Sequence, residues 1–162
     1  MKTREKILAL DDLERRLANH RQRGQRIVLA NGIFDLLHVG HVRYLQGAKA
    51  EGDVLVVAVN SDASARKLKG EHRPILSSQA RAELVAALAV VDYVVVFEDL
   101  DVERLLETLG PHVHAKGTDY TAETVPERES AARLGVRVAI VGDRKSHSTR
   151  ELLGRLRTTH GR

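Results

Sequence analysis

Two histidines three residues apart, His38 and His41, are the side chains of this sequence best placed to do chemistry. They follow a short apolar run, residues 27–30, which is broken by Asn31 and Gly32, and a helix-competent segment begins beside them. The N-terminus of a helix exposes unsatisfied N–H groups and a partial positive charge, so it attracts phosphate. Two imidazoles on one face of that terminus add hydrogen-bond donors. Strand, glycine turn, histidine pair and helix together predict a nucleotide-binding site.

Two other interpretations of the histidine pair stay open. His38 and His41 could share a metal ion, but zinc would need a third and a fourth ligand, and nothing nearby in the sequence supplies them. The pair could also be purely structural at the start of a helix. Gly40 favours a ligand, because a residue without a side chain lets a large molecule approach the backbone closely.

The block NGIFDLLHVGH, residues 31–41, resembles the HxGH signature of the nucleotidyltransferase superfamily, whose members transfer a nucleotidyl group onto a phosphate and release pyrophosphate. By this resemblance, His38 and His41 contact the triphosphate and stabilise charge on the phosphorus under attack, which is electrostatic rather than covalent catalysis. The resemblance also lays a stretch of chain along the nucleotide, and that stretch consists of Asn31, Gly32, Ile33 and Phe34.

Two side chains inside this block are expected to be structural. The Phe34 ring is expected to pack in the core rather than to stack on a base. Asp35 is expected to cap a helix or to anchor the loop, and it is left out of the catalytic set.

Length and composition limit what surrounds this block. The 162 residues suit one domain, residues 1–162, with an N-terminal helix within 1–25 and an α/β core over 26–162. The absence of cysteine excludes a disulfide framework and a cysteine-ligated zinc site. No apolar run approaches membrane-spanning length, and the N-terminus is unlike a signal peptide, so a cytoplasmic protein without a membrane partner is expected.

The formal net charge is +4 and the pI about 9.6, with the basic excess at the two ends of the chain. A nucleic-acid-binding domain would use such ends, but two Phe, three Tyr and no Trp leave few side chains to stack on bases. Solvated arginine-rich helices account for the charge better, and no nucleic-acid partner is expected.

Short apolar runs alternate with helical patterns along the chain. Strands are expected at residues 27–30, 54–59, 93–97, 112–115 and 136–141. Helices are expected at residues 9–23, from 39 onward, and at 79–90, 101–109 and 149–157. The run 54–59 is apolar throughout, which is typical of a strand buried on both faces of a parallel sheet. The pattern predicts an α/β fold, a Rossmann-like five-stranded parallel sheet flanked by helices, with the ligand beyond the carboxyl ends of the strands.

A basic cluster follows the second expected strand on that ligand side. It contains Lys67 and Lys69, and its simplest explanation is a solvated helix end. The resemblance places a phosphate-binding lysine in this segment, so one of the two is assigned to the phosphates, and which one stays open. Arg81 opens the next helix, where the dipole disfavours a cation, so either a ligand holds it or it is a surface arginine. We include Arg81 among the nucleotide-binding candidates.

The segment Lys116-Gly117-Thr118-Asp119-Tyr120 follows the fourth strand. Lys116 could reach a phosphate and Asp119 could accept from a hydroxyl, with Gly117 giving backbone access, although an ordinary turn is the alternative. The related family has K-G-G-D-Y at this place, so Thr118 is a departure that adds a side chain where only backbone is expected.

Ser148 and Thr149 precede the last helix, where such residues usually act as caps. In the superfamily a Ser-Thr pair at this place both caps the helix and binds the nucleotide phosphates. Arg150 replaces the threonine that the family commonly has next.

The resemblance extends from about residue 10 to residue 157 and is best to the adenylyltransferase domain of ADP-heptose synthesis, which acts on D-glycero-β-D-manno-heptose 1-phosphate. The matching phrases are NGIFDLLHVGH, VAVNSDASARKLKG, RPI, VDYVVVF and KGTDY. The resemblance implies an enzyme that converts ATP and the sugar phosphate to ADP-heptose and pyrophosphate with Mg²⁺, as a homodimer and in a free-standing form without a fused sugar kinase.

Two alternatives to this activity are kept. A cytidylyltransferase that uses CTP and glycerol 3-phosphate has the same loop signatures. A nucleotide-binding regulatory module would bind ATP without releasing pyrophosphate, and the intact His38, Gly40 and His41 count against it.

Overall fold

The computed structural model describes residues 1–143 and 149–159. Its strands are β1 (Ile27–Gly32), β2 (Val54–Asn60), β3 (Tyr93–Phe97), β4 (Val113–Gly117) and β5 (Arg137–Val141). They form one parallel sheet in the order β3-β2-β1-β4-β5. The five-stranded parallel α/β sheet predicted from the sequence is confirmed.

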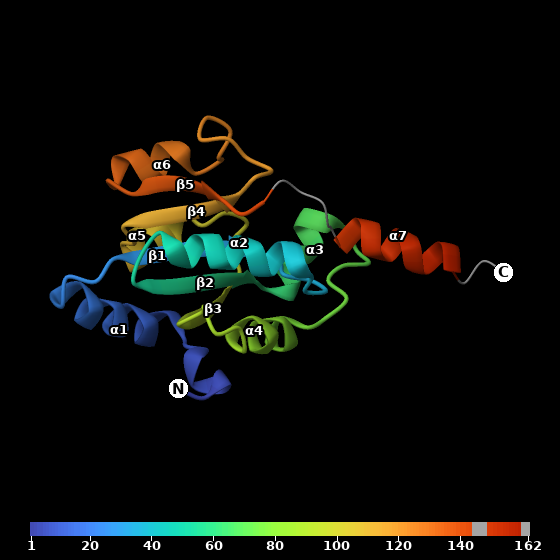
Figure 1. Ribbon diagram of the computed structural model, residues 1–162, viewed down its shortest axis with the longest axis horizontal. Coiled ribbons are helices and arrows are strands. Elements are labelled where there is room, and N and C mark those ends of the chain that lie inside the picture. Colours follow the sequence, from blue (N-terminus) through green and yellow to red (C-terminus); the bar gives the residue numbers. More distant parts are fainter. Residues whose placement is uncertain (144–148, 160–162) are drawn as a thin grey trace.

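Helices surround this sheet. They are the short η1 (Thr3–Lys6), then α1 (Leu10–Gln22), α2 (Val39–Ala50), α3 (Asp62–Lys69), α4 (Ser78–Ala86), α5 (Glu103–Leu109), α6 (Arg128–Arg133) and α7 (Thr149–Thr159). Figure 1 shows α2 in front of the sheet and α5 behind it. None of the helices in the described part of the chain is long and apolar enough to cross a membrane.

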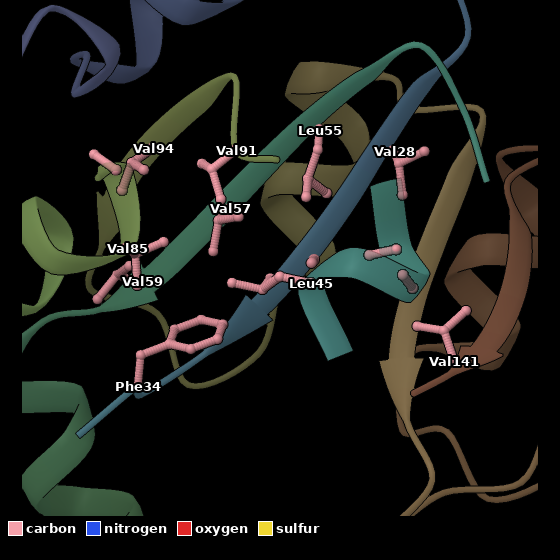
Figure 2. Close-up of a cluster of buried hydrophobic side chains, with 14 of the residues drawn as sticks. Val28, Phe34, Leu45, Leu55, Val57, Val59, Val85, Val91, Val94 and Val141 are labelled. Atoms are coloured by element: carbon pink, nitrogen blue, oxygen red, sulfur yellow. The ribbon is translucent and has the colours of Figure 1, made fainter. Parts of the chain in front are cut away.

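The sheet divides the core into two layers because successive side chains of a strand point to opposite faces. On one face, Val28 and Ala30 of β1 pack with side chains of α2 and α4. On the other face, Ile27 and Leu29 pack with side chains of α1, α5 and α6. Figure 2 shows the first layer, in which the Phe34 ring lies in one cluster with Leu45 of α2. The ring is 2% exposed, so the expectation that Phe34 packs in the core is confirmed.

Two helices are shorter than their apolar spacing predicts, and hydrogen bonds explain both ends. The helix expected at 101–109 begins at Glu103, because the Asp101 carboxylate accepts from the Glu103 N–H (3.1 Å). The helix expected at 79–90 ends at Ala86. The Lys6 ammonium donates to the carbonyls of Leu88 (3.3 Å) and Val91 (2.8 Å), which satisfies backbone acceptors of the turn that follows.

Some elements differ from the sequence-based expectations, and η1 and α3 were not among the expected helices. Strand β1 continues through Asn31 and Gly32, where a break was expected, so these two residues belong to the sheet. Helix α6 was not expected at all, since its six residues bury only Ala131 and give almost no apolar period.

Candidate functional site

The strand order reverses between β1 and β4, and the space beyond the carboxyl ends of these two strands is the candidate site, called the crevice below. The chain proceeds from β1 outward to β2 and β3, then crosses back to place β4 against the other side of β1. Pairing of β1 with β4 ends at Ala30 and Ala115, so Asn31 and Lys116 lie one residue beyond the last pair. Ligands of open α/β sheets bind at such a point, where the order reverses. The structure thus places two of the predicted ligand residues, Asn31 and Lys116, on the two sides of this crevice.

The histidine pair lies at the start of α2. His38 is the N-cap, and its Nδ1 accepts from the N–H of Gly40 (3.1 Å). The Nδ1 of His41 accepts in return from the N–H of His38 (3.4 Å), and the two rings stack with their centroids 3.9 Å apart. An Nδ1 that accepts carries no proton, so each neutral ring carries its proton on Nε2. The pair therefore caps the helix through its two Nδ1 atoms, and the ring proton of each neutral histidine lies on Nε2 at the positive end of α2.

The metal alternative gains no support from the geometry. Within the described residues no group of three or more His, Asp or Glu side chains could hold a metal ion. The structural alternative and the phosphate-binding hypothesis are compatible, because capping uses Nδ1 and phosphate binding would use Nε2.

The chain between β1 and α2 adopts a backbone conformation that ordinary residues rarely take. Phe34 and Leu36 both have positive φ, 54° and 51°. Gly32 lies against the Phe34 ring, since a Cβ added there would be 3.1 Å from the ring edge. Asp35 anchors the loop: its carboxylate accepts from Arg73 Nε (2.9 Å) and from two backbone N–H groups of the segment before α4. Of the two roles expected for Asp35, the loop anchor is the observed one, because His38 occupies the N-cap.

The structure corrects the prediction that Arg81 contacts the nucleotide. Its side chain has no exposed surface. Its Nη1 donates to the carbonyls of Ile33 (2.6 Å) and Asn60 (2.8 Å), its Nη2 to the Asp62 carboxylate (2.7 Å), and its Nε to the Leu76 carbonyl (2.9 Å). These protein oxygens, rather than a ligand, hold the cation near the start of α4. Arg81 joins the signature loop, the end of β2 and the start of α3 into one unit.

Both candidate lysines of the basic cluster lie on α3. Lys67 and Lys69 are exposed near its C-terminal end. The start of the helix is fixed by Ser61, whose hydroxyl oxygen accepts from the Ser64 N–H (3.1 Å), and by the Asp62 contact with Arg81. The helix thus holds the lysines on a rigid base after β2, with their side chains in solvent.

Lys116 lies in a mostly buried polar environment. Its Nζ is 3.6 Å from a carboxylate oxygen of Glu127, 3.5 Å from Oδ1 of Asn31, and 4.7 Å from the centre of the Tyr120 ring. Burial lowers the pKa of Lys116, while the Glu127 carboxylate opposes this shift and favours the charged ammonium. Glu127 precedes α6 and is itself buried. Sequence reasoning missed Glu127, because ten residues, including a turn, separate it from Lys116.

The strands are also tied together beneath the crevice. Burial raises the pKa of Tyr44, so its hydroxyl stays protonated, and it donates to the carbonyl of Ala115 (2.8 Å) and at 3.5 Å to that of Asn31. Tyr44 of α2 thereby bridges the ends of β4 and β1. This contact fixes the helix that carries His41 relative to both walls of the crevice.

The remaining candidates lie at the end of β4 and beyond β5. Gly117 ends β4, and Asp119 is exposed in the turn after it. The Thr118 hydroxyl donates to the carbonyl of Asp143 (2.7 Å), so the side chain that departs from the family pattern ties this turn to the chain after β5. Ser148 lies outside the described residues, and Thr149 is the first residue of α7.

The chain is similar to known proteins over most of its length. The family described as Cytidylyltransferase-like matches residues 29–155. A protein named "Bifunctional protein HldE" from Geobacter metallireducens is 47% identical over 156 residues, which are 96% of this chain and 32% of that protein. The protein of the same name from Geotalea uraniireducens is 48% identical over 153 residues, 94% of this chain and 31% of that protein. The chain thus spans about a third of the length of these curated relatives.

A solved structure shares the fold. It is titled as a lipopolysaccharide core biosynthesis protein from Thermoplasma volcanium, and its TM-score with this chain is 0.65 at 29% sequence identity. The match covers 75% of this chain and 100% of that one.

Proposed function

The chain belongs to the Cytidylyltransferase-like family, and from this premise we propose that it is a nucleotidyltransferase that transfers AMP from ATP to a heptose 1-phosphate and releases pyrophosphate. The observation that carries the proposal is the capped start of α2, where His38 and His41 offer donors beside the crevice that Asn31 and Lys116 flank. The substrate assignment rests on the similarity to HldE proteins over 94% to 96% of this chain and on the matching phrases of its sequence, from NGIFDLLHVGH to KGTDY.

The proposed reaction is an in-line displacement. An oxygen of the sugar phosphate attacks the α-phosphorus, the bond from that phosphorus to the bridging oxygen of pyrophosphate breaks, and pyrophosphate leaves with the electron pair. The attacking phosphate is ionised at neutral pH, because its second pKa is about 6, so no general base is needed. Catalysis then consists of positioning and of neutralising charge, the work assigned to His38, His41 and the lysines.

Magnesium is part of this proposal as an ion brought in on the triphosphate. Mg²⁺ prefers to keep several waters and to bind through substrate phosphates rather than in an all-protein cage. In this proposal the triphosphate, rather than a cluster of protein side chains, would hold the ion. When bound to the nucleotide, the ion neutralises phosphate charge. The homodimer and the cytoplasmic location stay predictions.

A side-by-side assay tests the substrates. We expect pyrophosphate release, measured with Mg²⁺ present, to be at least about tenfold faster in kcat/KM with ATP and heptose 1-phosphate than with CTP and glycerol 3-phosphate. Faster release with the second pair would overturn the substrate assignment and leave nucleotidyl transfer intact. ATP binding without pyrophosphate release from any tested pair would favour the regulatory module instead.

The two lysines of α3 are expected to respond differently to substitution. Residues two apart on a helix point about 200° away from each other, so only one of Lys67 and Lys69 can face the crevice. Alanine at the position that binds phosphate should cost about tenfold in kcat/KM, as for loss of a charged hydrogen bond. Alanine at the other position should change kcat/KM less than about twofold.

Steady-state kinetics of Lys67→Ala and Lys69→Ala, with ATP varied, makes the comparison, and the two variants serve as controls for each other. If both match the unmodified protein, the cluster is a solvated helix end and neither lysine binds phosphate.

A further inference from the structure

His114 is a fully buried histidine that the signature block does not include. It lies on β4 with 0% exposure, and its Nε2 is 3.0 Å from Oδ1 of Asn31 at the end of β1. The two residues share the face of the sheet on which Lys116 also lies, because residues two apart on a strand point the same way. The contact thus joins the two walls of the crevice.

The position of Lys116 identifies which atom of the Asn31 amide is the oxygen. Its ammonium has only donors, and it lies 3.5 Å from the same Oδ1. The amide atom that faces Lys116 must therefore be the oxygen. It follows that His114 donates to this oxygen through Nε2–H, and that Nδ1 is the nitrogen without a proton. Nδ1 is buried and has no hydrogen-bond partner within the described residues, which is tolerable for a lone pair and costlier for an N–H.

The His114 ring also keeps this donor at every working pH. Burial, and secondarily the nearby Lys116 charge, lower the pKa of His114 from 6.5 to about 3. A ring with this pKa is neutral throughout the range in which enzymes of this kind operate. A titrating role for His114 in catalysis is therefore not expected.

The other end of the Asn31 amide is left available. Its NH₂ makes no hydrogen bond within the described residues, and Asn31 is only half-buried at the mouth of the crevice. We propose that His114 is a positioning residue: it turns the Asn31 amide so that its N–H groups face the crevice and donate to an oxygen of the bound nucleoside triphosphate. This inference rests on the proposed function, because that function puts the nucleotide there.

A double-mutant cycle tests the inference. His114→Leu, Asn31→Ala and the double variant are compared by KM and kcat for pyrophosphate release and by the nucleotide Kd from calorimetry without acceptor. We expect His114→Leu to raise KM and Kd for the nucleotide about tenfold, the size of one lost hydrogen bond, with kcat changed less than about threefold. In the Asn31→Ala background His114→Leu should cost less than about twofold, since the residue it acts through is gone. His114→Gln, whose amide can donate in place of Nε2, should recover most of the affinity.

The outcomes separate the inference from the function on which it rests. Independent effects that multiply in the double variant, or a His114→Leu protein with unchanged nucleotide affinity, would overturn the inference alone. A pH inflection of kcat/KM between 6 and 9 that disappears with His114→Leu would also overturn it. Nucleotide binding without turnover would refute the proposed reaction. The double-mutant cycle would then be evaluated from the nucleotide Kd values of the four proteins, so the inference would still be tested. Thermal unfolding monitors the fold, and His114→Met replaces His114→Leu in the cycle if the leucine variant does not fold.

Discussion

Replacing His41 by alanine is expected to lower the turnover of pyrophosphate release by about 10²-fold or more, as for loss of one preorganised donor at developing charge. The reason is geometric: the His41 ring stacks on His38 at the positive end of α2, and because Nδ1 accepts from the backbone, the proton of the neutral ring lies on Nε2. A donor that acts on charge formed in the transition state affects kcat more than nucleotide affinity. Nucleotide binding should therefore weaken much less than turnover.

A control for this prediction separates the contribution of His41 to the helix cap from its contribution to turnover. Loss of the backbone contact to His38 should cost about 0.5–2 kcal/mol of stability, in the range of other helix caps. His41→Asn keeps a side-chain acceptor for that contact while shortening the reach of the donor, so it should retain most of the stability and still lose turnover. A folded His41→Ala protein with near-normal turnover would exclude a catalytic role for His41.

Replacing Arg81 by methionine is expected to destabilise the protein by about 3–5 kcal/mol, because several backbone acceptors each lose their donor at a cost of about 1–3 kcal/mol. Methionine fills part of the space but leaves the carbonyls of Ile33 and Asn60 and the Asp62 carboxylate without their donor. Buried acceptors that lose their partner pay the full cost of desolvation. The measurement is the free energy of unfolding from urea titration, with the m-value checked for two-state behaviour.

Arg133→Met is the matched control. Arg133 also contacts two carboxylates, Glu103 (3.0 Å) and Glu107 (3.1 Å), but its side chain is 57% exposed. Exposed pairs of this kind contribute about 0–1 kcal/mol. Equal destabilisation by the two substitutions would contradict the role assigned to Arg81.

The sequence alone was sufficient to predict the fold and to single out the signature block. The run from Val54 to Asn60 is apolar at nearly every position, and only a strand covered on both faces buries such a run. Residues 31–41 combine a strand end, glycines and paired histidines within one local segment, so their meaning does not depend on distant partners. Local patterns of this kind can be interpreted without coordinates because strand and helix periods are properties of neighbouring residues.

Contacts between distant segments required the tertiary structure. Arg81 resembled a ligand-binding cation because the dipole disfavours a cation at the start of a helix, whereas the fold brings it carbonyls from Ile33 and Asn60. Glu127 and His114 became part of the site only when the crossover placed β4 beside β1 and when Glu127, just before α6, came to lie against Lys116 at the end of β4. A buried charge or amide forms its hydrogen bonds with any polar group that the fold brings within about 3 Å. The spacing of two residues in the sequence does not predict that distance. The sequence determines which residue types the site contains. The packing of the sheet and its helices determines which partners orient those residues.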